Sequence, residues 1–269
     1  MKQASLDWGK LNEITSTWFT ETRRKLRRHR PDTSHSDERF CVLAQYCLIA
    51  CEEYRDAAFD AFAQDRFHAG LNSLRPILEH AIHLWWCGAE RQKVRERLDM
   101  WQKETARQRK NREEAWRDLK PRGSPAWVQR DKRADCWRRE LDKRCKVGKL
   151  PSIQELVQAL KNTPGLPPEL ASVYPLYRDL CRSSHAPLYL DEVFETRVGA
   201  RVTRSRREMP WMAPMESVYI PLVLVSAVDV YFQWKRTLLG DGFQQAKQIL
   251  DLHYKRAAQD AARRAEKAP

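Results

Sequence analysis

Apolar side chains recur at helical spacing along one long stretch of the chain, from about residue 37 to 65. Steps of three and four residues bring such side chains to the same face of an α-helix. This face is formed by Phe40, Leu43, Cys47, Cys51, Tyr54, Ala58 and Phe62. A long helix with one apolar face must bury that face against other elements, so the stretch favours a bundle of helices.

The rest of the chain supports an all-α fold. Only 9 glycines and 14 prolines occur in 269 residues, and strictly alternating segments are rare. We predict an irregular bundle of about eight helices, with Pro76 kinking one of them. The expected helices cover about 4–28, 37–65, 67–89, 90–119, 125–146, 152–163, 167–185, 214–239 and 242–265. Gly240 and Gly242 are predicted to break the last two apart, and 188–214 is expected to be an irregular basic loop or a short hairpin.

Cysteine usage and the N-terminus indicate a cytoplasmic protein. The seven cysteines are odd in number and lack disulfide-framework spacing, which favours buried, reduced thiols. The first residues lack the apolar segment of a signal peptide. Residues 218–234 are nearly all apolar, but Pro221 and Asp229 interrupt them, so we predict a core helix rather than a membrane span and expect no membrane partner.

Positive charge is concentrated between residues 90 and 149. This region holds 21 Lys and Arg against 11 Asp and Glu, an excess of ten in a chain of net charge +13. Two predicted helices flank the turn-forming segment Lys120-Pro-Arg-Gly-Ser-Pro125. We therefore divide the chain into a bundle core, 1–89 and 150–269, and an inserted basic helical hairpin, 90–149.

The hairpin also carries Trp101, Trp116, Trp127 and Trp137. Arginine and tryptophan together are typical of surfaces that hold phosphates and stack on bases, so we predict that like charges gather on one face and bind nucleic acid. The candidate contacts are Arg107, Arg109, Lys110, Arg112, Arg130, Lys132, Arg133, Arg138 and Arg139. The alternative is a solvated charged hairpin whose tryptophans pack its helices together.

A second group of cations lies where the helix of 167–185 is expected to end. Arg178 and Arg182 are four residues apart on one helical face, and His185 follows just before Pro187. Two guanidinium groups beside an imidazole suit the binding of a phosphate and the movement of a proton. The alternative is that these side chains cover the free carbonyls of a helix end.

A polar stripe on the helix of 67–89 is the other candidate cluster. Arg75, Glu79 and His83 follow one another at steps of four residues on an otherwise apolar helix. We expect Arg75 and Glu79 to be buried, either paired with each other or facing the segment from Tyr177 to His185. A metal site at Glu79, His80 and His83 lacks the second carboxylate and histidine helix of di-iron bundles, so neither a metal nor another cofactor is expected.

These motifs resemble known helical families. Leu74-Arg-x-x-x-Glu79 with the later Tyr177-x7-His185 resembles a bacterial family of unknown function, and Arg178-x6-His185 resembles the Arg-x(4–6)-His signature of HEPN domains. The likeness covers about residues 37–190 and excludes the hairpin. HEPN domains are helical bundles, often metal-independent ribonucleases of toxin–antitoxin and phage-defence systems, whose Arg and His meet across a homodimer.

The resemblance implies that His185 transfers a proton and that Arg178 clamps the phosphate, with Arg182 as the competing arginine and Asp179 in the place of the usual polar residue. The predicted function is thus an HEPN-like ribonuclease, with RNA a better candidate partner than DNA. Two alternatives remain: a non-catalytic helical protein that binds nucleic acid or a nucleotide, and a protein-interaction scaffold with an acidic partner.

Overall fold

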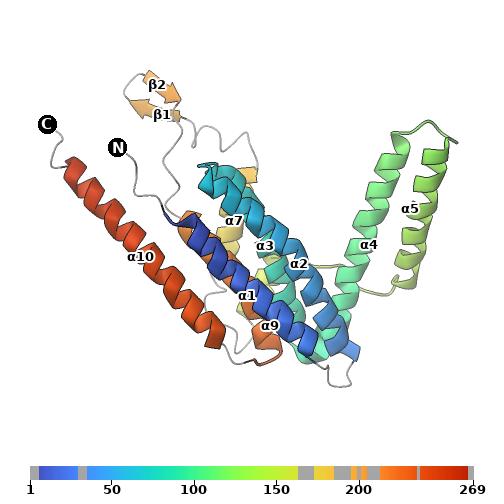
Figure 1. The fold of residues 1–269 in the computed structure, drawn as a ribbon. Helices are drawn as coiled ribbons and strands as arrows, with labels where there is room; N and C mark the ends of the chain where they lie inside the picture. The colour runs from blue at the N-terminus through green and yellow to red at the C-terminus, as the bar shows by residue number, and fades with distance from the viewer. Residues whose placement is uncertain are drawn as a thin grey trace.

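The structure, a computed structural model, describes residues 6–29, 35–162, 173–184, 195–198, 201–204, 213–234 and 237–265. It is an all-α helical bundle, as predicted, from which a helical hairpin projects (Figure 1). The helices of the bundle are α1 (Trp8–Arg28), α2 (His35–Ala63), α3 (Phe67–Gly88), α6 (Ile153–Lys161), α7 (Val173–Ser184), α9 (Ala213–Tyr231) and α10 (Thr237–Ala265).

Helix α3 lies at the centre of the bundle. It packs against α2, α6, α7 and α9, and its apolar side chains, among them Leu74, Ile77 and Leu78, are completely buried. Pro76 lies inside α3, which continues through it as one helix. Because α3 contacts both α7 and α9, it fixes the relative position of these two helices and of the candidate residues on them.

Helix α9 is the apolar run that raised the membrane question. It is the one helix in the described part of the chain that is long and apolar enough to span a bilayer, and 72% of its apolar window is buried inside the protein. Trp85 of α3 donates a hydrogen bond to the carbonyl of Val223 at 2.9 Å, which ties α9 to the central helix. A buried fraction of this size is expected for a helix in the core of a bundle.

The hairpin consists of a short 3-10 turn (Arg91–Lys93), α4 (Val94–Asp118) and α5 (Pro125–Lys143). Ser124 caps α5 by accepting a hydrogen bond from the backbone N–H of Trp127 at 3.2 Å, and Gly123 adopts φ 78°, which glycine tolerates best. Helix α4 contacts α2 and α3 and is joined along its length by α5, and Figure 1 shows both helices standing apart from the bundle.

Several expectations at element ends and faces were wrong. Helix α10 runs through Gly240 and Gly242, whereas the chain turns after α9, where Gln233 adopts φ 54°. Gly242 serves packing, because a Cβ there would lie 2.4 Å from Nε1 of Trp18. Tyr54, assigned to the buried face of α2, is 41% exposed.

The basic segment 188–214 contains a short hairpin in its described part. Strands β1 (Glu195–Val198) and β2 (Arg201–Arg204) pair antiparallel, with Glu195 opposite Arg204. This agrees with the hairpin alternative for that segment.

The cysteines fit the expectation only in part. All seven are free, and Cys41, Cys47, Cys51 and Cys87 are buried. Cys136 and Cys145, by contrast, are exposed on the hairpin, because they fall outside its interhelical seam.

Candidate functional site

The predicted pairing of Arg75 with Glu79 is present on α3. Nε of Arg75 donates to Oε1 of Glu79 at 2.9 Å, and the guanidinium lies 5.6 Å from the centre of the Tyr177 ring on α7. Burial, followed by a hydrogen bond with Cys181, raises the pKa of Tyr177 to about 12. Both predicted arrangements are therefore present. Arg75 pairs with Glu79 within α3, and it also contacts Tyr177 in the segment from Tyr177 to His185.

The expected burial of this pair was wrong. The side chains of Arg75 and Glu79 remain 28% and 34% exposed, because the pair lies at the edge of the contact between α3 and α7. A half-exposed ion pair stabilises a protein by about 1 kcal/mol or less. We therefore expect Glu79→Ala to lower the free energy of unfolding by less than about 1 kcal/mol in urea titrations. A loss of about 3 kcal/mol would show instead that the pair is buried in solution.

The two histidines of α3 point to different partners. Nδ1 of His83 donates to the carbonyl of Glu79 at 2.7 Å, and Nδ1 of His80 lies 3.8 Å from Sγ of Cys47 on α2. Burial lowers the pKa of both imidazoles. Glu79, His80 and His83 do not converge, and no group of three metal-ligating side chains occurs in the described ranges.

An acidic pair between α7 and α9 was not predicted from the sequence. Glu216, in the first turn of α9, is 5% exposed. Its burial, together with the nearby charge of Asp179 on α7, raises its pKa to about 7. The available signal was a carboxylate at the start of a helix that is largely apolar. A group with this pKa can accept or donate a proton near neutral pH.

The predicted catalytic residues are described unequally. Arg178 is exposed on α7, directly before Asp179. Arg182 also lies on α7, but its side chain lies outside the described part of the structure, and His185 lies outside the described residues. The structure therefore places Arg178 on the exposed side of α7, adjacent in sequence to Asp179, and the position of the imidazole stays a prediction.

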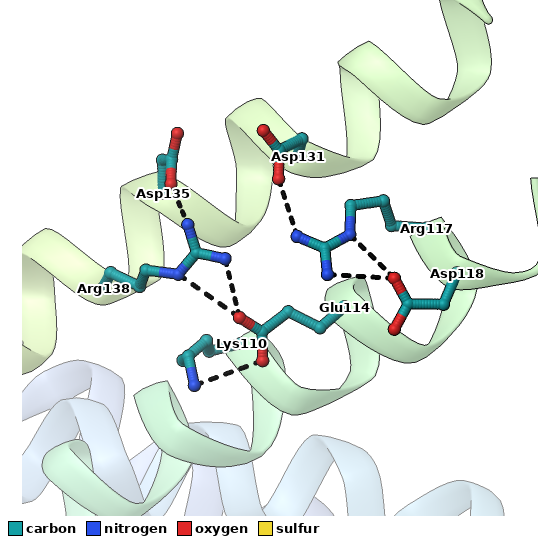
Figure 2. Close-up of polar contacts among 7 residues, drawn as sticks. All are labelled: Lys110, Glu114, Arg117, Asp118, Asp131, Asp135 and Arg138. Carbon is teal, nitrogen blue, oxygen red and sulfur yellow. Dashed lines mark hydrogen bonds and ion pairs between the residues drawn. The ribbon is translucent and has the colours of Figure 1, made fainter. Parts of the chain in front are cut away.

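Three acidic side chains of the hairpin, Glu113, Glu114 and Asp131, make ion pairs across the seam between α4 and α5. Glu113 accepts from Arg130 at 2.8 Å, Arg117 donates to Asp131 at 2.8 Å, and Figure 2 shows the neighbouring network in which Glu114 binds Lys110 and Arg138. The hydrogen bond from Arg130 to Glu113 and the one from Arg138 to Glu114 lower the pKa of these carboxyl groups. The seam is thus held by ionised pairs across a broad pH range.

This pairing divides the predicted nucleic-acid contacts into two groups. Ion pairs with hairpin carboxylates engage Arg107, Lys110, Arg112, Arg130 and Arg138. No such pair engages Arg109, Lys132, Arg133 and Arg139 within residues 90–149, all of which are described, and these four are exposed. Lys132 and Arg139 are seven residues apart and share the face of α5 opposite the buried Ala134.

The tryptophans of the hairpin also differ in their surroundings, since two are packed under an arginine and another faces solvent. Trp127 lies beneath Arg117 and Trp137 beneath Arg109, with guanidinium-to-ring distances of 5.7 and 4.9 Å. These two rings support the alternative in which tryptophan packs the hairpin helices together. Trp116, by contrast, is 48% exposed near the tip of the hairpin.

Comparisons of the chain with protein-family models, with curated proteins and with solved structures found no match. The fold and the cations of residues 90–149 define the protein as an all-α bundle with a basic helical hairpin.

Proposed function

We propose that the protein binds RNA through the cations that the hairpin leaves outside its interhelical seam. The observation that carries the proposal is the unequal pairing of charge within residues 90–149. Glu113, Glu114 and Asp131 are taken up by ion pairs across the seam, whereas several cations make no ion pair within the hairpin. Among these cations, Arg133 lies near enough to Glu113 to help lower its pKa. The excess of positive charge therefore faces solvent.

A surface of this kind binds phosphates with little dependence on sequence. Lysine and arginine release condensed counterions when they neutralise a phosphate backbone, so affinity falls steeply with salt. Lys132, Arg133 and Arg139 supply such charges on α5. Arg109 of α4 packs on the ring of Trp137 across the seam, but it is exposed and makes no ion pair within the hairpin, so it supplies a further charge. An acidic protein partner offers fewer regularly spaced anions, so RNA is the partner that this surface fits best.

The test reverses three cations on α5. We expect Lys132→Glu with Arg133→Glu and Arg139→Glu to weaken the binding of a fluorescent RNA about tenfold or more near physiological salt. Three lost phosphate contacts also flatten the salt dependence, by about 2 in the slope of log affinity against log salt for a single strand. Fluorescence anisotropy at several salt concentrations measures both effects.

A charge-matched variant on α10 serves as the control. Lys255→Glu with Arg256→Glu and Arg263→Glu changes the net charge equally at exposed positions outside the hairpin. It should leave RNA affinity within about twofold of the parent. Equal losses in the two variants would mean that overall charge, rather than the hairpin, attracts RNA.

The second candidate function is the HEPN-like, metal-independent ribonuclease of bacterial stress or phage defence. The observation that favours it is that α7 carries the exposed Arg178 and, at Asp179, interacts with Glu216, whose pKa is about 7. A cation and a group that titrates near pH 7 are parts that RNA cleavage needs. RNA carries its own nucleophile, the 2′-hydroxyl. His185 then serves as the acid or base, and Arg178 or Arg182 stabilises the charge on the phosphorane.

A further inference from the structure

A groove lies where the hairpin meets the bundle. It has a volume of about 640 Å³ and is lined by α2, α3 and α4, with Tyr46 and Trp101 on its walls. Tyr46 is 68% exposed, and its neighbours on the same face of α2, Val42 and Ile49, are 47% and 45% exposed. Solvent-facing aromatic and aliphatic groups beside a cavity of this size are typical of a ligand site.

One face of α4 leads from the groove toward the tip of the hairpin. Trp101, Thr105 and Arg109 line the cavity, and the next residues at the same helical spacing are Arg112 and Trp116. Arg109, Arg112 and Trp116 are exposed. At a rise of 1.5 Å per residue, the distance from Trp101 to Trp116 along the helix is about 22 Å. Aromatic rings and guanidinium groups therefore share one face from the groove toward the tip.

We propose that this groove and the adjoining face of α4 bind single-stranded RNA, with one unstacked base between Tyr46 and Trp101. The inference rests on the proposed RNA binding and adds the form of the RNA and the place where a base is held. The strand continues past Arg109 and Arg112, which contact its phosphates, to Trp116, which stacks on a further base. Arg112 remains available because its ion pair with Glu113 is long, at 3.9 Å, and its side chain is 65% exposed.

The chemistry of the groove fits a nucleobase better than an aliphatic side chain. Tyr46 and Trp101 offer π-faces, on which any base stacks, and Arg109 at the same cavity offers a cation for the adjoining phosphate. His80 also lines the cavity, and burial lowers its pKa, which favours the neutral imidazole that can donate or accept a hydrogen bond. A duplex keeps its bases stacked inside, so it cannot use the groove.

The experiment compares a single-stranded RNA of about 12 nucleotides with a duplex of the same sequence, a length within the range that such surfaces bind. We expect Tyr46→Ala to weaken single-strand binding about tenfold and to leave duplex binding unchanged, as measured by anisotropy. Tyr46→Phe should bind like the parent, because the ring is retained. Since Tyr46 is exposed, the thermal melting of Tyr46→Ala should match that of the parent.

Tyr54→Ala is the matched control, since Tyr54 is also exposed on α2 but does not line the groove. If Tyr46→Ala and Tyr54→Ala bind single-stranded RNA equally well, and the triple charge reversal on α5 still weakens binding, the hairpin binds RNA and the groove proposal fails. If the parent binds neither RNA, both proposals fail. A dimer in sedimentation velocity that Tyr46→Ala converts to a monomer would assign the groove to a second copy of the chain and overturn the inference.

Discussion

Glu216→Gln is expected to stabilise the protein, and to do so more strongly as the pH rises. Glu216 is buried, and its pKa in the folded protein lies near 7, whereas its ordinary value is 4.5. Between these two values the folded state keeps a proton that the unfolded state releases. Stability therefore falls as the pH rises through this window, and the loss is complete above the folded pKa.

Glutamine cannot ionise and is free of this loss. A pKa difference of about 2.5 units corresponds to about 3 kcal/mol, so Glu216→Gln should resemble the parent at pH 4.5 and exceed its free energy of unfolding by about 3 kcal/mol at pH 8. Within the described part of the chain, Asp179 on α7 and Tyr254 on α10 are titratable groups that interact with Glu216. Asp179 contributes to the raised pKa, so Asp179→Asn should reduce the gap.

Urea titrations from pH 4.5 to 8 measure this effect. The control is Glu96→Gln, the same substitution in the first turn of α4, where the side chain is exposed. It should not reproduce the gain of about 3 kcal/mol that is expected for Glu216→Gln at pH 8. Parallel pH curves for the parent and Glu216→Gln would show that Glu216 is solvated in the folded protein.

The second large effect is expected at His185. If its imidazole moves a proton, the protein should cleave RNA in the presence of EDTA and leave 2′,3′-cyclic phosphate ends. His185→Ala should then lose at least about a hundredfold in rate, which is the usual contribution of a positioned general acid or base. RNA affinity and the melting temperature should remain close to those of the parent.

The two arginines of α7 provide the internal comparison. Arg178 and Arg182 lie one helical turn apart, so they cannot reach the same phosphate with equal geometry, and the variant with the larger loss of rate identifies the clamp. His185→Ala purified in parallel controls for a contaminating nuclease. Intact RNA after incubation with the parent protein from pH 6 to 8, despite binding, would favour the non-catalytic function.

The helices could be predicted from the sequence because their signals are local. The stripe from Phe40 to Phe62, the Ser152–Glu155 capping box and the Pro-Arg-Gly-Ser-Pro turn each depend on residues within a few positions. Each lies where it was expected, except that Tyr54 of the stripe is exposed. The break at Gly240 and Gly242 was wrong because glycine also occurs where two helices pack closely. Trp18, which requires Gly242, is more than 200 residues away in the sequence.

The candidate site depends on contacts that sequence spacing does not contain. The step of four residues from Arg75 to Glu79 predicted their ion pair, but the exposure of that pair depends on how closely α7 approaches α3. Glu216 acquires its raised pKa only because α9 buries it beside Asp179 of another helix. The sequence places Tyr46 outside the buried stripe of α2. That face forms one wall of a groove only because α4 lies opposite it.

By itself, the sequence determined the all-α class, the bounds of most helices and the concentration of positive charge in residues 90–149, since these follow from periodicity, turn residues and composition. The tertiary structure decided which of those charges are neutralised. Glu113 and Glu114 pair with Arg130 and Arg138 only because α5 folds back along α4, and a Coulomb interaction at hydrogen-bond distance depends on that approach. The cations that the fold leaves outside this seam are the ones available to a phosphate.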